Sequence, residues 1–467
     1  MARRHRQGRR TVRESLAALL DPGSWREYGA LAVAAQRAAR SRDDLVASTP
    51  ADGVLTGTGR IGGVRVAVVA YDYTVLAGTQ GVTGHRKTDR LLDLAARDGL
   101  PVVLFAEGGG GRPSDTDHPT VAGLELGTFA SFARLRTPRI GIAGGYCFAG
   151  NAALLGMCDV SIGIAGASIG MGGPAMIEAA GLGSVAPQDV GPLDVHLDSG
   201  AVDIEAADDG AAVDLAARLV GLVAGPPRPG TRPDQRRLRD VVPDNRRHAY
   251  DVRDVLAVLA DEDSLIELQA RHGRAMTTAL GRLHGRAVGF LASNPRHGAG
   301  AIDAAAASKA GRFLRLCDRF GLPVVSLCDT PGIMVGPAAE RTGLVRAVGD
   351  LFAAGAGLRM PLATVVLRKA YGLGAMAMAG GGFHVPRLTV AWPTGEVGPM
   401  GLEGAVRLAY GRQLESVADE AERKARFDAL VAAAYERGEA LSAAEHFELD
   451  DVIDPADTAE ALAAALF

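Results

Sequence analysis

Apolar runs and amphipathic segments alternate along the chain, and this alternation predicts an α/β fold. VRVAVVA (64–70) and PVVLFAE (101–107) are almost wholly apolar, as is typical of buried strands. Between them, KTDRLLDLAARDG (87–99) has apolar residues at helical spacing and ends on a glycine, a common helix stop. Strands of this kind alternating with helices favour a parallel sheet covered by helices on both faces.

The same order of elements occurs twice. GRIGGVRVAVVAYD, which begins at Gly59, aligns with GRLHGRAVGFLASN, which begins at Gly281, 222 residues further on. The same separation, without a gap, brings Gly78 onto Gly300 and one GLPVV segment onto the other. Similarity held at a fixed separation indicates a repeated structural unit. The sequence therefore predicts two tandem domains related by internal duplication.

The later part of each copy aligns at a slightly larger separation. A shift of 224 residues brings Gly150 onto Gly374 and Ala167 onto Ala391. Between the copies, VAGPPRPGTRPDQRR is rich in proline and arginine and is typical of an irregular linker. The predicted parts are an N-terminal helical arm at 1–43, a first domain at 44–226, a linker at 227–249 and a second domain at 250–467.

Composition narrows the function only slightly. The formal net charge is −4 for 467 residues, so composition indicates no nucleic-acid or membrane partner. RRHRQGRR near the N-terminus is basic, but TVRESLAALLDP follows with a helical pattern, which favours a solvated helix start. No secretory signal pattern is visible, and the four cysteines form no CxxC pair. We expect a soluble cytoplasmic protein with no metal in this chain.

Two stretches of small residues, CFAGNA (147–152) and YGLGAM (371–376), each follow a predicted strand at equivalent places in the two copies. The first turn of a helix has backbone N–H groups without partners inside the helix, and small residues let a carbonyl approach them. Aimed at a thioester oxygen, such donors stabilise an enolate, so both stretches are interpreted as oxyanion holes. Close helix packing is the alternative. A phosphate-binding loop is disfavoured, because neither GxxxxGK[ST] nor GxGxxG lies between a strand and a helix.

Several segments resemble one protein family. GHRK and GLPVVLFAEGGG in the first copy, with LCDTPGIMVGPAAERTGLVRAVGDLF, LRKAYGLGAMAMAG and AWPTGEVGPMGLEGAV in the second, are similar to the carboxyltransferase (beta) subunit of biotin-dependent acyl-CoA carboxylases. The resemblance is closest to the propionyl-CoA carboxylase type and covers nearly the whole chain. It implies two crotonase-like (ClpP/crotonase) domains and a dimer-based homo-oligomer, commonly a hexamer. The active site would lie between the first domain of one subunit and the second domain of another.

The resemblance also implies a reaction, in which a carboxyl group passes from biotin on a separate carrier protein to the α carbon of an acyl-CoA. It assigns the thioester oxygen to Gly374 and Ala375, and the ureido oxygen of biotin to Gly150 and Asn151. Asn151 stands where the family's CAGGA-like segment has a second glycine, so its side chain is expected to narrow or alter that hole. The implied substrate-binding residues are Ala377, Met376, Gly109, Gly110, Ala149, Tyr371, Gly172 and Gly173.

Ala377, with Met376 beside it, corresponds to the position that helps to choose the acyl group in the family. No MKM-type biotinyl lysine and no ATP-binding signature are visible, so the biotin carrier and a biotin carboxylase are expected on partner chains. Two alternatives remain open from the sequence. One is biotin-independent enolate chemistry on acyl-CoA, such as decarboxylation, and the other is a non-catalytic scaffold subunit of a carboxylase complex. The acyl group cannot be read from the sequence.

Charged residues near the predicted holes admit two interpretations each. Lys87 and Lys309 are either solvated helix lysines or contacts to a phosphate or carboxylate. Arg368 and Lys369 are candidates to meet CoA phosphates or another subunit. The loop histidines are interpreted as structural residues rather than as catalytic bases, and they are His85, His297 and His384.

Overall fold

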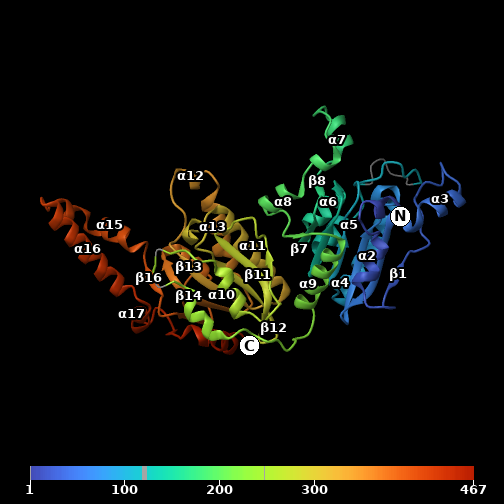
Figure 1. Cartoon of the computed structure of the whole chain (residues 1–467). Coiled ribbons are helices and arrows are strands. Elements are labelled where there is room, and N and C mark those ends of the chain that lie inside the picture. The colour runs from blue at the N-terminus through green and yellow to red at the C-terminus, as the bar shows by residue number, and fades with distance from the viewer. Residues whose placement is uncertain (1, 118–123, 244, 247) are drawn as a thin grey trace. The chain divides into compact units, whose positions relative to one another are not determined.

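The chain forms two compact units, Met1–Pro226 and Pro227–Phe467, each organised around one large β-sheet. Figure 1 shows the computed structural model, which describes residues 2–117, 124–243, 245–246 and 248–467. Of the predicted N-terminal arm, strand β1 (Arg26–Tyr28) pairs with β2 (Val54–Ile61) at the edge of the first sheet. No helix among the described residues is long and apolar enough to span a bilayer.

The first unit contains a seven-stranded sheet in the order β1-β2-β3-β4-β5-β7-β9 and a separate parallel pair, β6 and β8. Its other strands are β3 (Val64–Tyr71), β4 (Val102–Phe105), β5 (Arg139–Ala143), β6 (Tyr146–Phe148), β7 (Val160–Ile164), β8 (Ser168–Gly170) and β9 (Ile204–Ala206). Its helices are α1 (Ala2–Arg6), α2 (Val12–Leu19), α3 (Arg42–Ser48), α4 (Val82–Asp98), α5 (Thr128–Arg134), α6 (Gly150–Gly156), α7 (Pro174–Ala179), α8 (Leu193–Ser199) and α9 (Asp209–Val223).

The second unit repeats this arrangement, with the order β10-β11-β12-β13-β14-β15-β17 and β16 paired to β14. Its strands are β10 (Ile266–Leu268), β11 (Met276–Leu283), β12 (Arg286–Ser293), β13 (Val324–Thr330), β14 (Leu362–Tyr371), β15 (Leu388–Ala391), β16 (Glu396–Gly398) and β17 (Asp451–Val452). Its helices are α10 (Val252–Leu259), α11 (Ala304–Phe320), α12 (Pro337–Glu340), α13 (Leu344–Ala356), α14 (Gly372–Met378), α15 (Leu402–Glu415), α16 (Glu420–Arg437), α17 (Ala440–Glu445) and α18 (Thr458–Leu466).

Each sheet is mixed rather than wholly parallel. Strands β3, β4, β5, β7 and β9 run parallel, as predicted, but β1, β2 and β3 pair antiparallel. The sequence prediction was wrong for these edge strands. Gly62 and Gly63 form a two-residue turn with positive φ angles of 53° and 83°, which joins β2 and β3 as a hairpin. The second sheet has the same three antiparallel strands at its edge.

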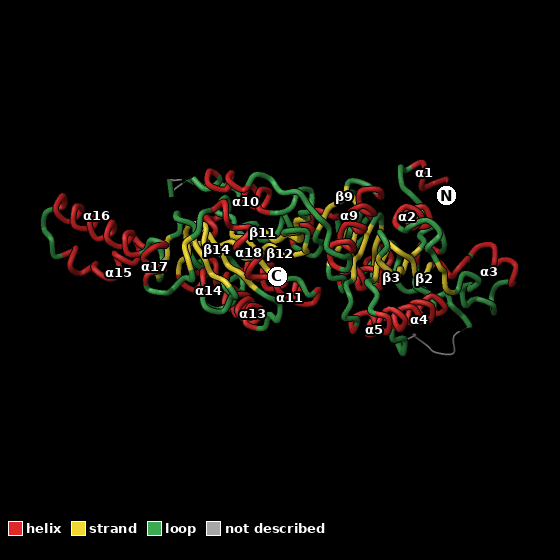
Figure 2. The backbone as a smooth tube through the Cα atoms, turned by 90° about the horizontal axis from the view of Figure 1, so that it is seen from below, coloured by secondary structure: helices red, strands yellow, loops and turns green. Residues whose placement is uncertain are grey.

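Helices cover both faces of each sheet, as the apolar strands predicted (Figure 2). In the first unit α4 and α5 lie on one side and α2 and α9 on the other. The helix ends predicted at Gly99 and Gly321 are confirmed, because both residues cap their helices in the left-handed conformation. These glycines turn the chain from α4 into β4 and from α11 into β13.

The predicted match of Gly78 with Gly300 is also seen in the fold. Both glycines have positive φ, at 61° and 83°. A Cβ atom on Gly78 would collide with the carbonyl oxygen of Glu107, and one on Gly300 with that of Asp329. Each glycine therefore lets its loop approach the end of the neighbouring parallel strand, which is the place where the two candidate sites are built.

Candidate functional site

Each unit contains a short helix that begins directly after a strand with a run of small residues. In the first unit β6 leads into α6, and we call residues Ala149–Ala152 the first station. In the second unit β14 leads into α14, and we call residues Gly372–Ala375 the second station. These are the two stretches that the sequence identified as candidate oxyanion holes.

Strand pairing establishes which residues of the two stations are equivalent. Strand β6 pairs with β8 so that Phe148 lies opposite Gly170. Strand β14 pairs with β16 so that Tyr371 lies opposite Gly398. Since β8 and β16 follow corresponding strands in the two sheets, Phe148 and Tyr371 are equivalent and stand 223 residues apart.

This register corrects the sequence alignment by one residue. The residues that follow, Ala149 and Gly372, both have positive φ angles, of 49° and 53°. Asn151 is therefore the counterpart of Gly374, and Gly150 is not. The error arose because several small residues adjoin one another, so a shift of one position still pairs glycine with glycine.

The predicted match of Ala167 with Ala391 is also wrong. Ala391 is the last residue of β15, whereas Ala167 lies beyond the end of β7, just before β8. Strand registers make Gly163 of β7 the counterpart of Ala391. The loop from α14 to β15 is longer than the loop from α6 to β7, and the alignment did not allow for that insertion.

At both stations the first turn of the helix has backbone N–H groups without an acceptor inside the helix. Ala149 donates its N–H to the carbonyl of Gly170 over 2.9 Å, and Ala153 donates to the carbonyl of Ala149. The intervening N–H groups of 150–152 belong to the first turn, where no carbonyl inside the helix can accept them. At the second station the helix begins at Gly372, directly after Tyr371, so the N–H groups of 372–374 fall in its first turn.

Asn151 and Gly374 are equivalent residues, and each brings its helix into contact with the preceding loop, but by different contacts. The amide of Asn151 is fully buried, and its Oδ1 accepts the N–H of Gly110 over 3.0 Å, while its Nδ2 donates to Gly78. At the equivalent place, a Cβ on Gly374 would lie 2.6 Å from the Cα of Gly332. The helix is thus tied to the preceding loop by a side-chain amide in one unit and by backbone contact in the other.

The predicted substrate-binding residues of the first unit are Gly109, Gly110, Ala149, Gly172 and Gly173. Of these, Ala149 belongs to the first station, Gly110 contacts it and Gly173 contacts the residue before it, whereas Gly109 lies next to Thr79 and Gly172 next to Met176. A Cβ on Gly110 would lie 2.7 Å from the Cβ of Ala149, so loop and helix start are in contact. Gly173 packs on the Phe148 ring, where a Cβ would lie 3.2 Å from the ring. Gly109 is exposed at the rim.

A groove with a volume of about 710 Å³ opens beside the second station. Gly372, Ala375 and Met376 line one part of it, and the loop 382–384 lines another. The remaining wall comes from residues 397–399, from one face of α15 and from the end of α16. Sequence reasoning missed the α15 wall, although its apolar residues recur at helical spacing.

The structure separates two neighbouring candidates for acyl-chain selection. Met376 is 41% exposed and lines the groove. Ala377 is 1% exposed and does not line it, so its side chain faces the protein interior.

Tyr371 is buried, and its hydroxyl donates to Glu396 over 2.8 Å. Burial and the charge of Glu396 raise the pKa of Tyr371, so this phenol stays protonated and serves as a donor.

Comparison with known proteins decides the family. The carboxyl transferase domain model matches residues 3–466. The chain belongs to the carboxyl transferase family. The methylmalonyl-CoA carboxyltransferase 12S subunit of Propionibacterium freudenreichii subsp. shermanii is 32% identical, over 99% of this chain and 89% of its own length. The propionyl-CoA carboxylase beta chain of Saccharopolyspora erythraea is 32% identical, over 100% and 88%.

Solved structures agree with this family. A single-chain, multi-domain long-chain acyl-CoA carboxylase matches with a TM-score of 0.93 and 54% identity over 99% of this chain, which spans only 46% of that longer chain. The transcarboxylase 12S hexamer, with methylmalonyl-CoA bound, matches with a TM-score of 0.88 and 31% identity, over 100% and 90%. The protein is a carboxyltransferase of the biotin-dependent acyl-CoA carboxylase type, built from two tandem crotonase-like domains.

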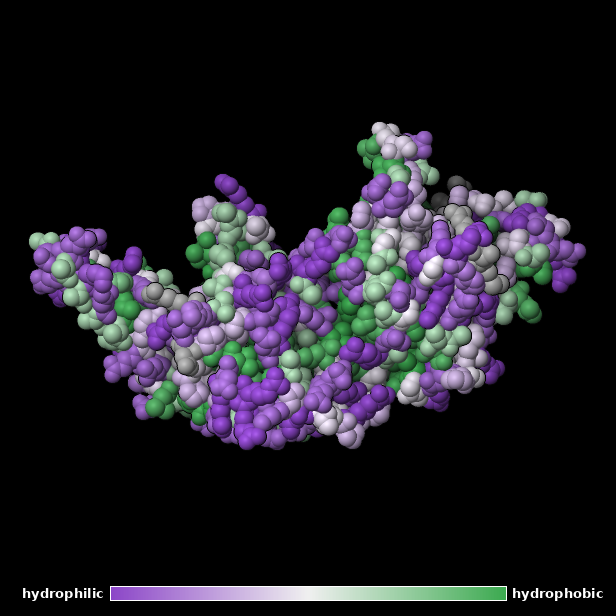
Figure 3. Space-filling view, viewed as in Figure 1, coloured by the Kyte–Doolittle hydropathy of each residue, from purple (hydrophilic) through white to green (hydrophobic). Residues whose placement is uncertain are grey.

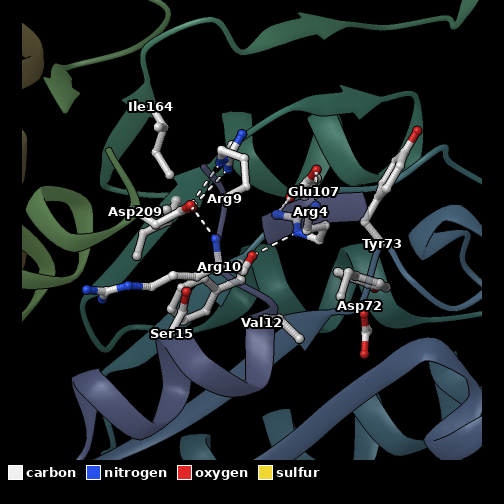
Figure 4. A pocket seen from close by; sticks show the side chains of 14 residues that line it. Arg4, Arg9, Arg10, Val12, Ser15, Asp72, Tyr73, Glu107, Ile164 and Asp209 are labelled. Atoms are coloured by element: carbon white, nitrogen blue, oxygen red, sulfur yellow. Dashed lines mark hydrogen bonds and ion pairs between the residues drawn. The ribbon is translucent and has the colours of Figure 1, made fainter. Parts of the chain in front are cut away.

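The basic N-terminal segment of this carboxyltransferase forms ion pairs inside the first unit (Figure 4). Arg4 donates two hydrogen bonds of 2.8 Å to Glu107, and Arg9 donates two of 2.9 Å to Asp209. The prediction of a solvated helix start was wrong for Arg4 and Arg9, because their partner acids are largely buried and require a cation nearby. It holds for His5, Arg6 and Arg10, which are exposed. Burial raises the pKa of Glu107, and Arg4 opposes that shift.

Lys87 and Lys309 are buried, so both interpretations of them were wrong. The Nζ of Lys87 donates to the backbone carbonyls of Ala51 and Val54, at 2.7 and 2.5 Å. The Nζ of Lys309 donates to the carbonyl of Gln269 over 2.8 Å. Burial lowers the pKa of Lys87 to about 8. Each lysine ties its helix to an irregular segment of the same unit.

Arg368 and Lys369 both approach Asp329 of the same unit. Arg368 is 2% exposed and donates to Asp329 over 3.1 Å, while the Nζ of Lys369 lies 3.7 Å from the same carboxylate. The expectation that Arg368 meets CoA phosphates was wrong, because its guanidinium is buried and engaged. Of the histidines, buried His85 bonds to Thr128 over 2.9 Å.

The third histidine, His384, bonds to the carbonyl of Phe447 and lines the groove. His297 is partly exposed, and burial lowers its pKa. Among the described residues, no group of three or more His, Cys, Asp or Glu side chains is placed to hold a metal ion.

Proposed function

We propose that this chain transfers a carboxyl group from biotin, held by a separate carrier protein, to the α carbon of an acyl-CoA. The observation that carries the proposal is the pair of stations. Enolate chemistry on one thioester needs one oxyanion hole, whereas carboxyl transfer develops negative charge on two molecules. A chain that repeats the same helix start in both domains fits the second requirement.

The stations would each hold one of the two oxygens. The donors proposed at the second station are the N–H groups of Gly374 and Ala375. By the strand register their counterparts at the first station are the N–H groups of Asn151 and Ala152, one residue on from the Gly150–Asn151 pair that the resemblance implied. Each well-placed donor is worth about 3 kcal/mol in the transition state. The Asn151 side chain is turned into the protein, where its Oδ1 accepts the N–H of Gly110, so it does not project into the first station.

When bound, biotin supplies the carboxyl group that is transferred. This chain's own residues position the two reactants and stabilise negative charge, which requires neither a nucleophile nor a paired-carboxylate site. The groove beside the second station offers the space that an organic ligand needs there. The family match favours this reaction over biotin-independent decarboxylation and over a scaffold role.

Partner proteins follow from the same proposal. The longer long-chain acyl-CoA carboxylase is a single chain with several domains, and this chain matches 46% of it. We propose that this chain works together with a biotin carboxylase and a biotin carrier. The transcarboxylase 12S relative is a hexamer. A homo-oligomer of this chain is therefore the proposed active form.

Proline substitutions test the donors one at a time, because proline has no N–H. Ala375→Pro removes a proposed donor and is expected to lower the rate of carboxyl transfer by about 10²- to 10³-fold. Leu373 lies two residues earlier and its side chain is exposed, so Leu373→Pro serves as the control. It removes an N–H that is not a proposed donor. It is expected to lower the rate less than tenfold.

Carboxyl transfer between a carboxylated thioester and biotin is followed by isotope exchange, and assembly is followed by sedimentation. A normally assembled Ala375→Pro protein that keeps its rate within tenfold of the wild type would rule out this donor. Exchange of the acyl-CoA α proton with deuterated water, measured in the same variant, reports which oxygen the second station holds. Loss of that exchange assigns the thioester to it.

A further inference from the structure

The groove beside the second station is larger than a short acyl group requires. Its volume of about 710 Å³ lies in the range of pockets that hold whole organic ligands. An acetyl or propionyl group would fill only a small fraction of it. The groove reaches Gly372 and Ala375, so a ligand in it touches the place where the reacting group is proposed to sit.

One long wall of the groove is a continuous apolar face of α15. Its residues recur at helical spacing, and they are Leu402, Ala405, Val406, Ala409 and Tyr410. Figures 1 and 2 show α15 beside α16 in an antiparallel hairpin, and Figure 3 shows polar and apolar surface interspersed over this arm. The end of α16 contributes Ala434 and Gly438 to the same groove.

The width of the groove depends on small side chains. Ala405, Ala409 and Ala434 present only a methyl group each, and Gly438 presents none. Met376 also lines the groove, with a flexible thioether that adapts its shape to an apolar neighbour. The charged lining residues Arg437 and Glu448 are exposed, so their heads lie in water while the wall stays apolar.

We propose that this groove binds the hydrocarbon tail of a long-chain acyl-CoA, with Met376 and the α15 face as its selective wall. The inference rests on the proposed carboxyltransferase function and adds its substrate class. An unbranched hydrocarbon chain suits a groove whose lining is mostly apolar. Each methylene moved from water into it improves binding roughly fourfold, so affinity rises steeply with chain length.

The test compares acyl-CoA substrates from acetyl- to hexadecanoyl-CoA in the assembled carboxylase. For the wild type, kcat/KM is expected to rise with chain length. Ala409→Phe and Ala405→Phe place a ring in the groove, and each is expected to lower the ratio of dodecanoyl-CoA to propionyl-CoA kcat/KM at least tenfold. Ala432→Phe is the matched control, because Ala432 is exposed on α16 and does not line the groove. It should keep the wild-type ratio.

Three results would overturn the inference. A wild-type preference for acetyl- or propionyl-CoA is one. Equal loss of rate at every chain length in the α15 variants is the second, since it would place the biotin arm in the groove. Dissociation of the oligomer in those variants is the third, since it would place a second copy of the chain there. Absence of carboxylation at all lengths in the wild type would instead contradict the proposed function.

Binding gives an independent readout. Calorimetry of the unsubstituted protein with dodecanoyl-CoA and with acetyl-CoA is expected to show at least 100-fold tighter binding of the longer thioester, and a tenfold smaller difference in Ala409→Phe. Equal affinities for the two thioesters would contradict the groove assignment even if carboxyl transfer itself is observed.

Discussion

Gly374 and Gly411 are both glycines within helices of the second unit, but their surroundings differ. A Cβ on Gly374 would meet the backbone of Gly332 at 2.6 Å, whereas nothing lies within 4 Å of the place where a Cβ on Gly411 would be. We expect Gly374→Ala to lower the free energy of unfolding by about 1–3 kcal/mol through overpacking. Gly411→Ala should raise it by up to about 1 kcal/mol, because alanine is the better helix former.

Urea denaturation of the two variants and the wild type measures both changes. The same substitution in the same secondary structure serves as its own control. Equal effects of the two substitutions would show that α14 does not press against the loop after β13, and would remove the packing explanation of its small residues.

Single residues also mark where sequence reasoning ends. The small residues of the stations were identified from their position after a strand, but the orientation of Asn151 was not. Its amide satisfies Gly110 and Gly78, and both partners come from loops far away in the sequence. Lys87 is a second example. Its place on an amphipathic helix does not predict that its Nζ is buried and donates to two backbone carbonyls.

At the scale of elements, the N-terminal segment is held to the first unit by ion pairs of unequal burial. Arg4 and Glu107 have side chains only 13% and 14% exposed, whereas Arg13 is 53% exposed in its pair with Glu27. We expect Arg4→Ala to lower the free energy of unfolding by about 3 kcal/mol, because it leaves Glu107 as a buried charge without its partner. Arg13→Ala should lower it by less than about 1 kcal/mol.

The comparison of these two variants by urea denaturation isolates burial from charge removal. A second variant, Glu107→Gln in the Arg4→Ala background, should recover part of the lost stability, since it removes the uncompensated charge. Similar small losses for Arg4→Ala and Arg13→Ala would mean that the segment is not docked as described.

Elements were largely predictable where one periodicity governs them. The wholly apolar strands and the helices that stop at Gly99 and Gly321 follow from pattern and from a glycine's access to positive φ. The antiparallel edge was missed because the Gly62–Gly63 turn was not interpreted as a hairpin signal. The α15 face was missed because two of its five residues are alanines, which contribute little to a hydrophobic pattern, and because Leu408 and other apolar residues lie off the face.

At the scale of the whole molecule, the duplication was predictable because both copies keep the same elements at a constant separation. The one-residue error at the stations was not avoidable by that route, since only strand pairing distinguishes adjacent small residues. The groove lay beyond sequence reasoning for a different reason. The groove forms where α14, α15 and α16 come together, so no single segment of the sequence predicts it.

The central claim is that this chain moves a carboxyl group between an acyl-CoA and biotin. The most direct measurement supplies the purified protein with a carboxylated thioester labelled in its transferable carboxyl group, with and without a biotinylated carrier. The account predicts that label appears on the carrier's biotin and that the thioester keeps its label when biotin is absent. Loss of label at the same rate without biotin, or no transfer with any malonyl- or methylmalonyl-type thioester, would contradict it.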